Sequence, residues 1–197
     1  NEYRPFIKPI EERNLIIIKG YHHWAGRALH VIEALELIVE DIRNYDIYVY
    51  SAHVIVVQKI KEINKKYNLN IQFSTRANQI SQTELLEKFG KAKIAIGNNI
   101  SDGIPNTLLE ALILGAFPIQ SNPGGVTEDY INDGENGFLI KECSNQFEIS
   151  KHILKAIKNE RLLFKAFEKN KKTAKNLNYK LIKEKVVLSY KTIENKL

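Results

Sequence analysis

Short apolar runs alternate along the chain with stretches in which apolar residues recur every three or four positions. The runs predict buried strands at residues 14–20, 45–52, 70–74, 93–98, 117–121 and 138–140. The periodic stretches predict helices at residues 27–43, 53–67, 81–87, 105–114 and 127–132. Strands that alternate with helices favour right-handed βαβ units, and therefore a parallel sheet with helices on both faces.

This alternation predicts a doubly wound, Rossmann-like α/β domain with about six parallel strands and a C-terminal helical extension. Residues 14–145 form the predicted core. Residues 146–197 carry the pattern of two or three helices that complete the domain. We interpret residues 1–13 as a linker or first extension.

The composition limits where the chain functions. Its only cysteine, Cys143, excludes an internal disulfide and fits a reducing compartment such as the cytoplasm. No apolar run is long enough to predict a membrane-spanning helix. The chain contains no methionine and begins with Asn1, so we expect it to be a fragment of a longer protein.

Positive charge is concentrated in the C-terminal helices. Residues 141–197 hold 15 Lys and Arg against 6 Asp and Glu, a net charge of +9, whereas residues 1–140 have a net charge of −3. These helices are a candidate contact with the inner face of a membrane or an acidic partner, although Lys-rich solvated surfaces are the simpler interpretation. They lack the glycines and interleaved aromatics of a single-strand nucleic-acid platform, so no nucleic acid is expected.

The loops that follow the strands are the predicted location of a ligand site. In open parallel sheets, ligands bind beyond the carboxyl ends of the strands. One of these loops holds a carboxylate and leads into an apolar helix that carries a second one. The loops expected at this edge are residues 20–26, 51–53, 75–80, 98–105 and 121–126.

An unusual set of polar residues opens that helix. Asp102 and Gly103 follow a strand, and Pro105 suits the first helical turn. The amides of residues 106–108 would then point out of the helix N-terminus and could bind an anion. Glu110 lies further along, where a carboxylate can accept hydrogen bonds from both hydroxyls of a ribose. The pattern predicts a cradle for a diphosphate with a sugar on either side.

Simpler interpretations exist for both carboxylates. Asp102 could cap the helix, and Glu110 could pair with a lysine. However, residues 94–140 contain no Lys or Arg that could serve as a local partner. The spacing of the two carboxylates around Gly103 therefore favours a binding role over a structural one.

Three blocks in order carry a resemblance to a known family. They read DGIPNTLLEA at 102–111, GGVTE at 124–128 and DGENGFLI at 133–140. This pattern resembles the C-terminal, donor-binding half of GT-B-fold, family 4 type retaining glycosyltransferases. The family usually has Glu at the position of Asp102, so this chain departs from the pattern by one methylene group.

The resemblance implies roles for individual residues. The first acid of the pattern would lie beside the donor sugar and the second would bind the nucleotide ribose, which makes Asp102 and Glu110 the expected catalytic residues. In the family, basic residues near the first strand hold the diphosphate, and residues after the third strand contact the base. The expected substrate-binding residues are Lys19, Arg27, Arg76, Gly103, Ile104, Pro105, Asn106, Thr107, Leu108, Gly124 and Gly125.

The resemblance also implies a reaction and its partners. The chain would be the nucleotide-sugar-binding lobe of an enzyme that makes a polysaccharide, glycolipid or glycoprotein glycan, and a missing N-terminal lobe would bind the acceptor. The sequence has no Asp-x-Asp motif, and the adjacent His22 and His23 lack the spacing of helical metal ligands. We therefore expect no metal and no other cofactor.

Two alternative functions stay open at this point. One is a lobe of a non-hydrolysing sugar-nucleotide epimerase with the same architecture, in which the two carboxylates would act as acid and base. The other is a non-catalytic binding module of a surface-polysaccharide complex, whose basic helices would contact a membrane or partner. Binding of a nucleotide would distinguish the transferase lobe from the module.

Overall fold

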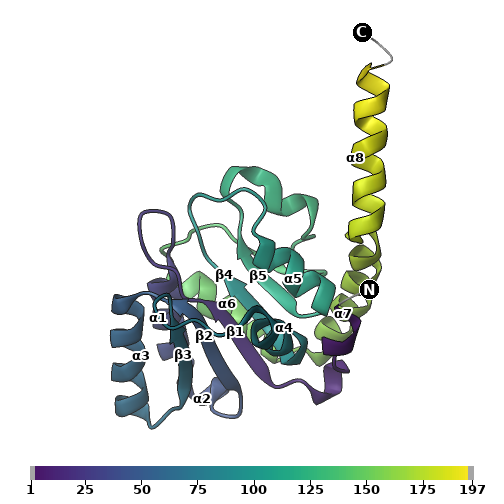
Figure 1. Ribbon diagram of the computed structural model, residues 1–197. Coiled ribbons are helices and arrows are strands. Elements are labelled where there is room, and N and C mark those ends of the chain that lie inside the picture. Colours follow the sequence, from purple (N-terminus) through teal and green to yellow (C-terminus); the bar gives the residue numbers. More distant parts are fainter. Residues whose placement is uncertain (1–2, 195–197) are drawn as a thin grey trace.

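Residues 3–194 are described by the structure, a computed structural model (Figure 1). The strands are β1 Leu15–Lys19, β2 Asp46–Ala52, β3 Ile71–Thr75, β4 Ala92–Gly97, β5 Phe117–Ser121 and β6 Phe138–Ile140. The helices are α1 Ala28–Glu36, α2 Val39–Ile42, α3 Val54–Tyr67, α4 Gln82–Lys91, α5 Asn106–Leu114, α6 Gln146–Ile157, α7 Glu160–Asn176 and α8 Tyr179–Glu194. Short 3-10 helices span η1 Arg4–Phe6, η2 Ile10–Glu12 and η3 Pro123–Asp129.

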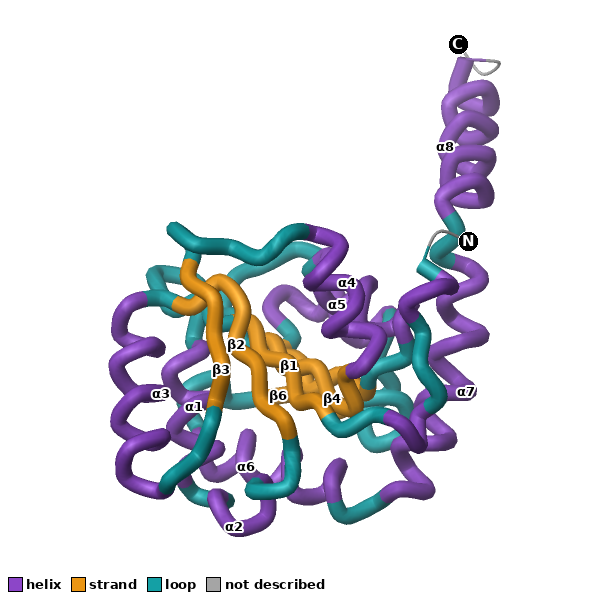
Figure 2. The backbone as a smooth tube through the Cα atoms, turned by 60° about the horizontal axis from the view of Figure 1, so that its bottom comes forward, coloured by secondary structure: helices purple, strands orange, loops and turns teal. Residues whose placement is uncertain are grey.

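The strands form one sheet in the order β3-β2-β1-β4-β5-β6, and every neighbouring pair is parallel. Helices α1, α3 and α6 cover one face of the sheet, and α4 and α5 cover the other (Figures 1 and 2). This arrangement confirms the predicted doubly wound α/β fold of six parallel strands.

The central strand β1 shows why the apolar runs are continuous rather than alternating. Ile16, Ile17 and Ile18 are all fully buried. Ile16 and Ile18 pack in the cluster beneath α1, α3 and α6, whereas Ile17 packs in the cluster beneath α4 and α5. A strand covered on both faces has no solvent-facing position, so every residue of the run is apolar.

Two predicted helices differ from the structure. The helix expected at 27–43 is interrupted after Glu36, because Ile38 leaves helical geometry with φ −127° and turns into the core while Leu37 stays exposed. The helix expected at 127–132 is instead the 3-10 helix η3, which begins at Pro123. Its two glycines have positive φ, a conformation incompatible with a regular α-helix.

Helix α4 follows its sequence signals closely at its start. Ser81 accepts a hydrogen bond from the amide of Glu84, and the Glu84 side chain accepts one from the amide of Ser81, which is a complete capping box. The helix continues to Lys91, beyond the predicted end at residue 87, and runs directly into β4 without a loop.

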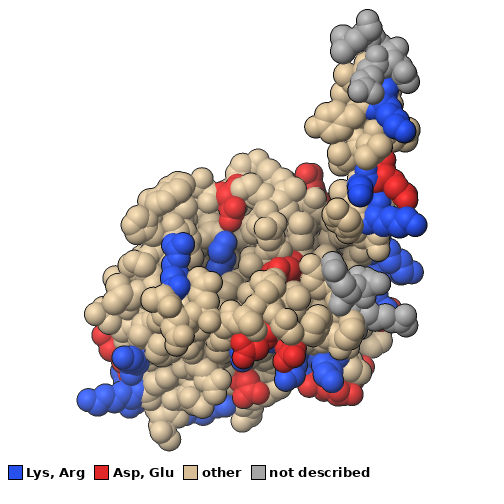
Figure 3. Space-filling view, viewed as in Figure 1, with Lys and Arg blue, Asp and Glu red and all other residues tan. Residues whose placement is uncertain are grey.

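The last helix stands away from the rest of the molecule (Figures 1 and 2). Its large apolar side chains are exposed, including Tyr190 at 68% and Leu188 at 65%. Basic side chains gather along α8 and the adjoining part of α7 (Figure 3). The predicted contact of these helices with a membrane stays a prediction, and no helix of the described residues has the length and apolar character needed to cross a bilayer.

The predicted division into residues 1–13, 14–145 and 146–197 also stays a prediction. Residues 1, 2 and 195–197 lie outside the described residues. Within the first segment, Arg13 is buried at 2% exposure and Gly90 of α4 lies against the backbone of Phe6.

Candidate functional site

The loops at the carboxyl edge of the sheet are joined by backbone hydrogen bonds. The amide of Arg27 donates to the carbonyl of Asn98 at 2.8 Å, and the amide of Ile100 donates to the carbonyl of Ala25 at 2.8 Å. The side-chain amide of Asn98 donates a further hydrogen bond to the carbonyl of Arg27 at 3.2 Å. The loop after β1 and the loop after β4 therefore form one surface at the predicted ligand edge.

Asp102 lies on this surface between an amide and an ammonium group. Its Oδ2 accepts a hydrogen bond from Asn99 Nδ2 at 3.0 Å and lies 3.5 Å from Lys19 Nζ. Asn99 is 2% exposed, and its backbone amide donates to Ser121 Oγ at 2.8 Å. Asp102 does not cap α5, since Pro105 occupies the cap position and no side-chain cap is formed there.

The N-terminus of α5 opens beside Asp102. A Cβ added to Gly103 would meet no atom within 4 Å, and Ile104 is 40% exposed, so the approach to the helix is open. Asn106 and Thr107 begin the helix, and no bond from their amides is formed among residues 3–194. The amide of Leu108 was expected to be free as well, but it donates to the carbonyl of the cap residue at 2.9 Å.

Glu110 lies on the side of α5 that faces α4. Its Oε1 accepts a hydrogen bond from Gln82 Nε2 at 2.9 Å. Burial raises the pKa of Glu110, and the bond from Gln82 partly offsets that rise. Tyr50 of β2 is buried nearby and shares a hydrogen bond with Thr107; its pKa is raised by burial, with a smaller contribution from Glu110.

A half-buried carboxylate with a raised pKa reduces the stability of the folded state whenever it is charged. The Glu110→Gln variant should therefore melt at a higher temperature than wild type at pH 7, since the folded state no longer holds this charge. The gain should disappear as the pH falls through the raised pKa, where wild-type Glu110 becomes neutral. Thermal melts at pH 7 and pH 4 test this, and an equal difference at both pH values would contradict it.

Two of the predicted cations lie at the same edge. Arg27 Nη1 donates to the carbonyls of His23 at 3.0 Å and Gly26 at 2.8 Å, which fixes the guanidinium against its own loop. The guanidinium carbon of Arg76, an exposed residue, lies 5.3 Å from the ring centroid of Tyr21. This contact brings the loop after β3 against the loop after β1.

The remaining predicted residues of this edge are two glycines, and a histidine lies in the loop after β1. Gly124 and Gly125 have φ of 73° and 82°, and a Cβ at either position would meet no atom within 4 Å. His22 Nδ1 accepts a hydrogen bond from the amide of Leu29 at 3.2 Å, and so supports the loop. In the described part of the chain, no three His, Cys, Asp or Glu side chains are grouped to hold a metal ion.

A hollow of about 370 Å³ lies over the carboxyl ends of β4, β5 and β6, and Asn99 contributes to its wall. Asn122 and Glu128 line it as well and are joined by a hydrogen bond of 2.7 Å. The Cys143 thiol donates to the carbonyl of Asn99 at 3.5 Å, and burial raises its pKa, so it is a packing residue rather than a thiolate.

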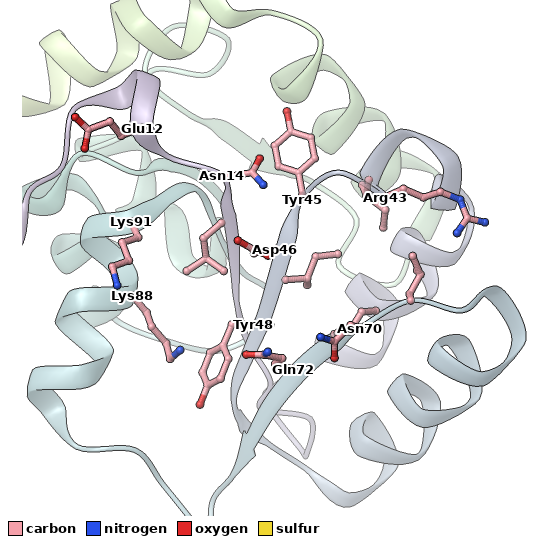
Figure 4. A pocket seen from close by; sticks show the side chains of 15 residues that line it. Glu12, Asn14, Arg43, Tyr45, Asp46, Tyr48, Asn70, Gln72, Lys88 and Lys91 are labelled. Atoms are coloured by element: carbon pink, nitrogen blue, oxygen red, sulfur yellow. The ribbon is translucent and has the colours of Figure 1, made fainter.

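Another polar hollow, of about 500 Å³, lies at the opposite edge of the sheet (Figure 4). Lys88 and Lys91 of α4 border it on one side, and Asp46 and Tyr48 of β2 on the other (Figure 4). The Lys88 ammonium lies 4.0 Å from the Tyr48 ring centroid. Because this lining comes from the amino halves of the strands, the hollow is separate from the loops that carry the predicted site residues.

Several residues of the carboxyl edge were absent from the sequence-based set. Asn98 and Asn99 connect the loops, Ser121 orients Asn99, and Gln82 binds Glu110. The two asparagines had a detectable signal, since they are polar and directly follow an apolar strand. Gln82 had none, because its contact depends on the packing of two helices.

Comparisons with known proteins agree with this fold. The glycosyltransferase of Rickettsia africae has a TM-score of 0.72 and 22% identity over 92% of this chain and 48% of that one. The C-terminal domain of the group 1 glycosyl transferase LpcC from Francisella tularensis has a TM-score of 0.69 and 18% identity, covering 86% of this chain and 94% of that one. A variant of TarM from S. aureus, in complex with Fondaparinux, alpha-GlcNAc-glycerol and UDP, has a TM-score of 0.70 and 17% identity, covering 90% of this chain and 35% of that one.

The chain thus spans about half the length of the Rickettsia africae protein and about a third of TarM. A comparison with curated proteins gave no match. The sequence profile described as glycosyl transferases group 1 matches residues 1–179, which is most of the chain. The chain therefore belongs to the group 1 glycosyl transferase family.

Proposed function

We propose that this chain is the donor-binding lobe of a retaining glycosyltransferase. The observation that carries the proposal is the arrangement around the N-terminus of α5. Asp102 lies before the helix beside Lys19, and Glu110 lies one turn into it beside Gln82. Both are at the edge where open parallel sheets bind ligands, and the chain belongs to a glycosyltransferase family.

The geometry supports a specific orientation of the donor. Glu110 lies next to the first turn of α4, which follows the loop that contains Arg76. A nucleoside would therefore place its ribose at Glu110 and its base towards that loop. The diphosphate would bind the amides of Asn106 and Thr107, where the helix dipole favours negative charge. The sugar would then lie at Asp102.

In the proposed reaction, the bond between the anomeric carbon and the diphosphate oxygen breaks. A new bond forms from that carbon to the acceptor hydroxyl oxygen, and the hydroxyl proton passes to the departing diphosphate. The lobe contributes by stabilising the charge that develops on the diphosphate, through the α5 amides and the cations Lys19 and Arg27. The sequence has no Asp-x-Asp motif, which supports metal-independent chemistry.

The proposed acceptor site is on an N-terminal lobe, because the chain spans about half of the Rickettsia africae protein. The acceptor would belong to a growing polysaccharide, glycolipid or glycoprotein glycan, and the reaction would take place in the cytoplasm or at the inner face of a membrane. The family match is to transferases, and no observation favours the epimerase.

Calorimetry with nucleoside diphosphates tests this proposal directly. UDP is the first probe, because the TarM structure contains it, followed by GDP and ADP. We expect one of the three to bind in the micromolar range, with little sugar transfer by the lobe alone. Absence of binding to all three would contradict the proposed function and favour a non-catalytic module. Retention is tested separately, from the anomeric configuration of the product of the two-lobed enzyme.

A further inference from the structure

The carboxylate of Asp102 is held asymmetrically. Both of its contacts, from Asn99 and from Lys19, are made to the same oxygen, Oδ2. Among residues 3–194, no hydrogen bond to the other oxygen is formed. One oxygen of this carboxylate is thus clamped by two donors, while the other stays available to a ligand.

The two donors differ in how firmly they are fixed. Asn99 is buried, and its backbone amide is bound to Ser121 Oγ at 2.8 Å. Lys19 is the last residue of β1, its side chain is 24% exposed, and its ammonium lies 3.5 Å from Asp102, which is 28% exposed. Ion pairs with this exposure are weak because water screens them and the lysine chain loses entropy. Lys19 is therefore the member of the group that can exchange partners.

A diphosphate at the N-terminus of α5 would compete with Asp102 for Lys19. It carries at least two negative charges against one on the carboxylate, and the helix dipole adds to its binding. The other cation of this edge, Arg27, already donates from Nη1 to loop carbonyls. Of the two cations, Lys19 is consequently held by the weaker contacts with the protein.

We infer that Lys19 is shared between Asp102 and the donor diphosphate, so that binding of the diphosphate transfers Lys19 to phosphate and releases Asp102 for the sugar. Asn99 keeps Asp102 in position during the exchange. The inference rests on the proposed function and adds a binding order to it: the diphosphate binds first, and Asp102 then becomes available to the sugar. It assigns Asn99 as a positioning residue.

Binding of inorganic pyrophosphate, measured by calorimetry, tests the exchange without knowledge of the base or sugar. The Asp102→Asn variant frees Lys19 and should bind pyrophosphate about two- to fivefold more tightly than wild type, the range expected for loss of a competing, partly exposed ion pair. The Lys19→Gln variant should bind more weakly. The double variant should match Lys19→Gln within about twofold, because the gain from Asp102→Asn acts only through Lys19.

The matched control is Glu128→Gln, which removes the same charge at the same edge from a carboxylate that is bound to Asn122 instead of a lysine. It should change the affinity by less than about twofold, since screening weakens remote charges. An equal gain in Glu128→Gln and Asp102→Asn would overturn the inference, as would a gain that persists in the double variant. Asp102→Ser provides a second variant if Asp102→Asn is poorly folded.

The outcomes separate this inference from the proposed function. If wild type binds neither pyrophosphate nor any nucleoside diphosphate, the proposed function fails, and the inference fails with it. If wild type binds both but the variants show no coupling between Lys19 and Asp102, only the inference fails.

Discussion

The Glu110→Ala variant is expected to bind the nucleoside diphosphate at least about 100-fold more weakly than wild type. Glu110 would accept two hydrogen bonds from the ribose diol, and bonds to a charged acceptor contribute about 1.5–3 kcal/mol each. The carboxylate is half-buried and its pKa is raised by burial, so its unused hydrogen-bonding capacity is costly until a ligand satisfies it. Calorimetry with the nucleotide that binds wild type measures the loss.

A chemical control identifies the ribose as the group that Glu110 contacts. The 2′-deoxynucleoside diphosphate should bind wild type more weakly than the ribonucleotide, and the Glu110→Ala variant should distinguish the two poorly. If removal of the 2′-hydroxyl weakens binding by the same factor in wild type and in the Glu110→Ala variant, Glu110 does not contact the 2′-hydroxyl. Glu87→Ala removes an exposed glutamate of α4 and should leave the affinity unchanged.

The same residue shows a conflict between binding and stability. Glu110→Gln is expected to stabilise the fold at pH 7 and also to weaken nucleotide binding, because a neutral amide is a poorer acceptor than a carboxylate. A residue whose removal improves stability but impairs binding is typical of a functional site. A structural glutamate would lose stability on substitution.

Much of the fold was predictable because its signals are local. The central parts of β1 and β2, residues 16–18 and 47–50, are apolar without interruption, as required for strands buried on both faces. The Ser81–Glu84 pair marked the start of α4. The interruption at Ile38 was not predictable, because Leu37 and Ile38 both continue the apolar pattern and only the packed core distinguishes them.

The site was predictable in its location but not in its contacts. The position of Asp102 and Glu110 after a strand and on the next helix follows from the order of elements along the chain. The ion pair between Lys19 and Asp102 depends on how far β1 and β4 extend relative to each other, and β1 and β4 pair with a register shift near Leu15. Periodicity along one strand contains no information about such a shift.

The segment 1–13 gives the clearest example of a long-range contact that was missed. Its polar and proline-rich composition is typical of a linker, yet Arg13 ends in the interior. Arg13 donates to the carbonyls of Ala92 at 3.0 Å and Leu114 at 2.8 Å, and twice to that of Lys8. Partners 79 and 101 residues away cannot be identified from local sequence.

Arg13 stabilises the C-terminus of α5, the helix that carries the site. The carbonyl of Leu114 is one of the last of that helix and has no helical partner, and a cation is favourable at this end of the dipole. The Phe167 ring of α7 covers the guanidinium, with its centroid 5.0 Å from the guanidinium carbon. Burial lowers the pKa of Arg13 to about 10, so it stays charged at neutral pH.

The Arg13→Met variant is therefore expected to lose about 3–5 kcal/mol of unfolding free energy. Methionine fills much of the volume but leaves the buried carbonyls of Ala92 and Leu114 without a donor, at a cost of about 1–3 kcal/mol each, with the loss of the packed cation added. Urea unfolding followed by circular dichroism measures the change. Arg161→Met, at an exposed arginine of α7, should change it by less than about 0.5 kcal/mol.

The Arg13→Lys variant tests whether the charge or the geometry of the guanidinium matters. A lysine keeps the charge but cannot reach all three carbonyls, so this variant should also be less stable than wild type. A urea midpoint equal to that of wild type would show that the hydrogen bonds of the guanidinium do not stabilise the end of α5.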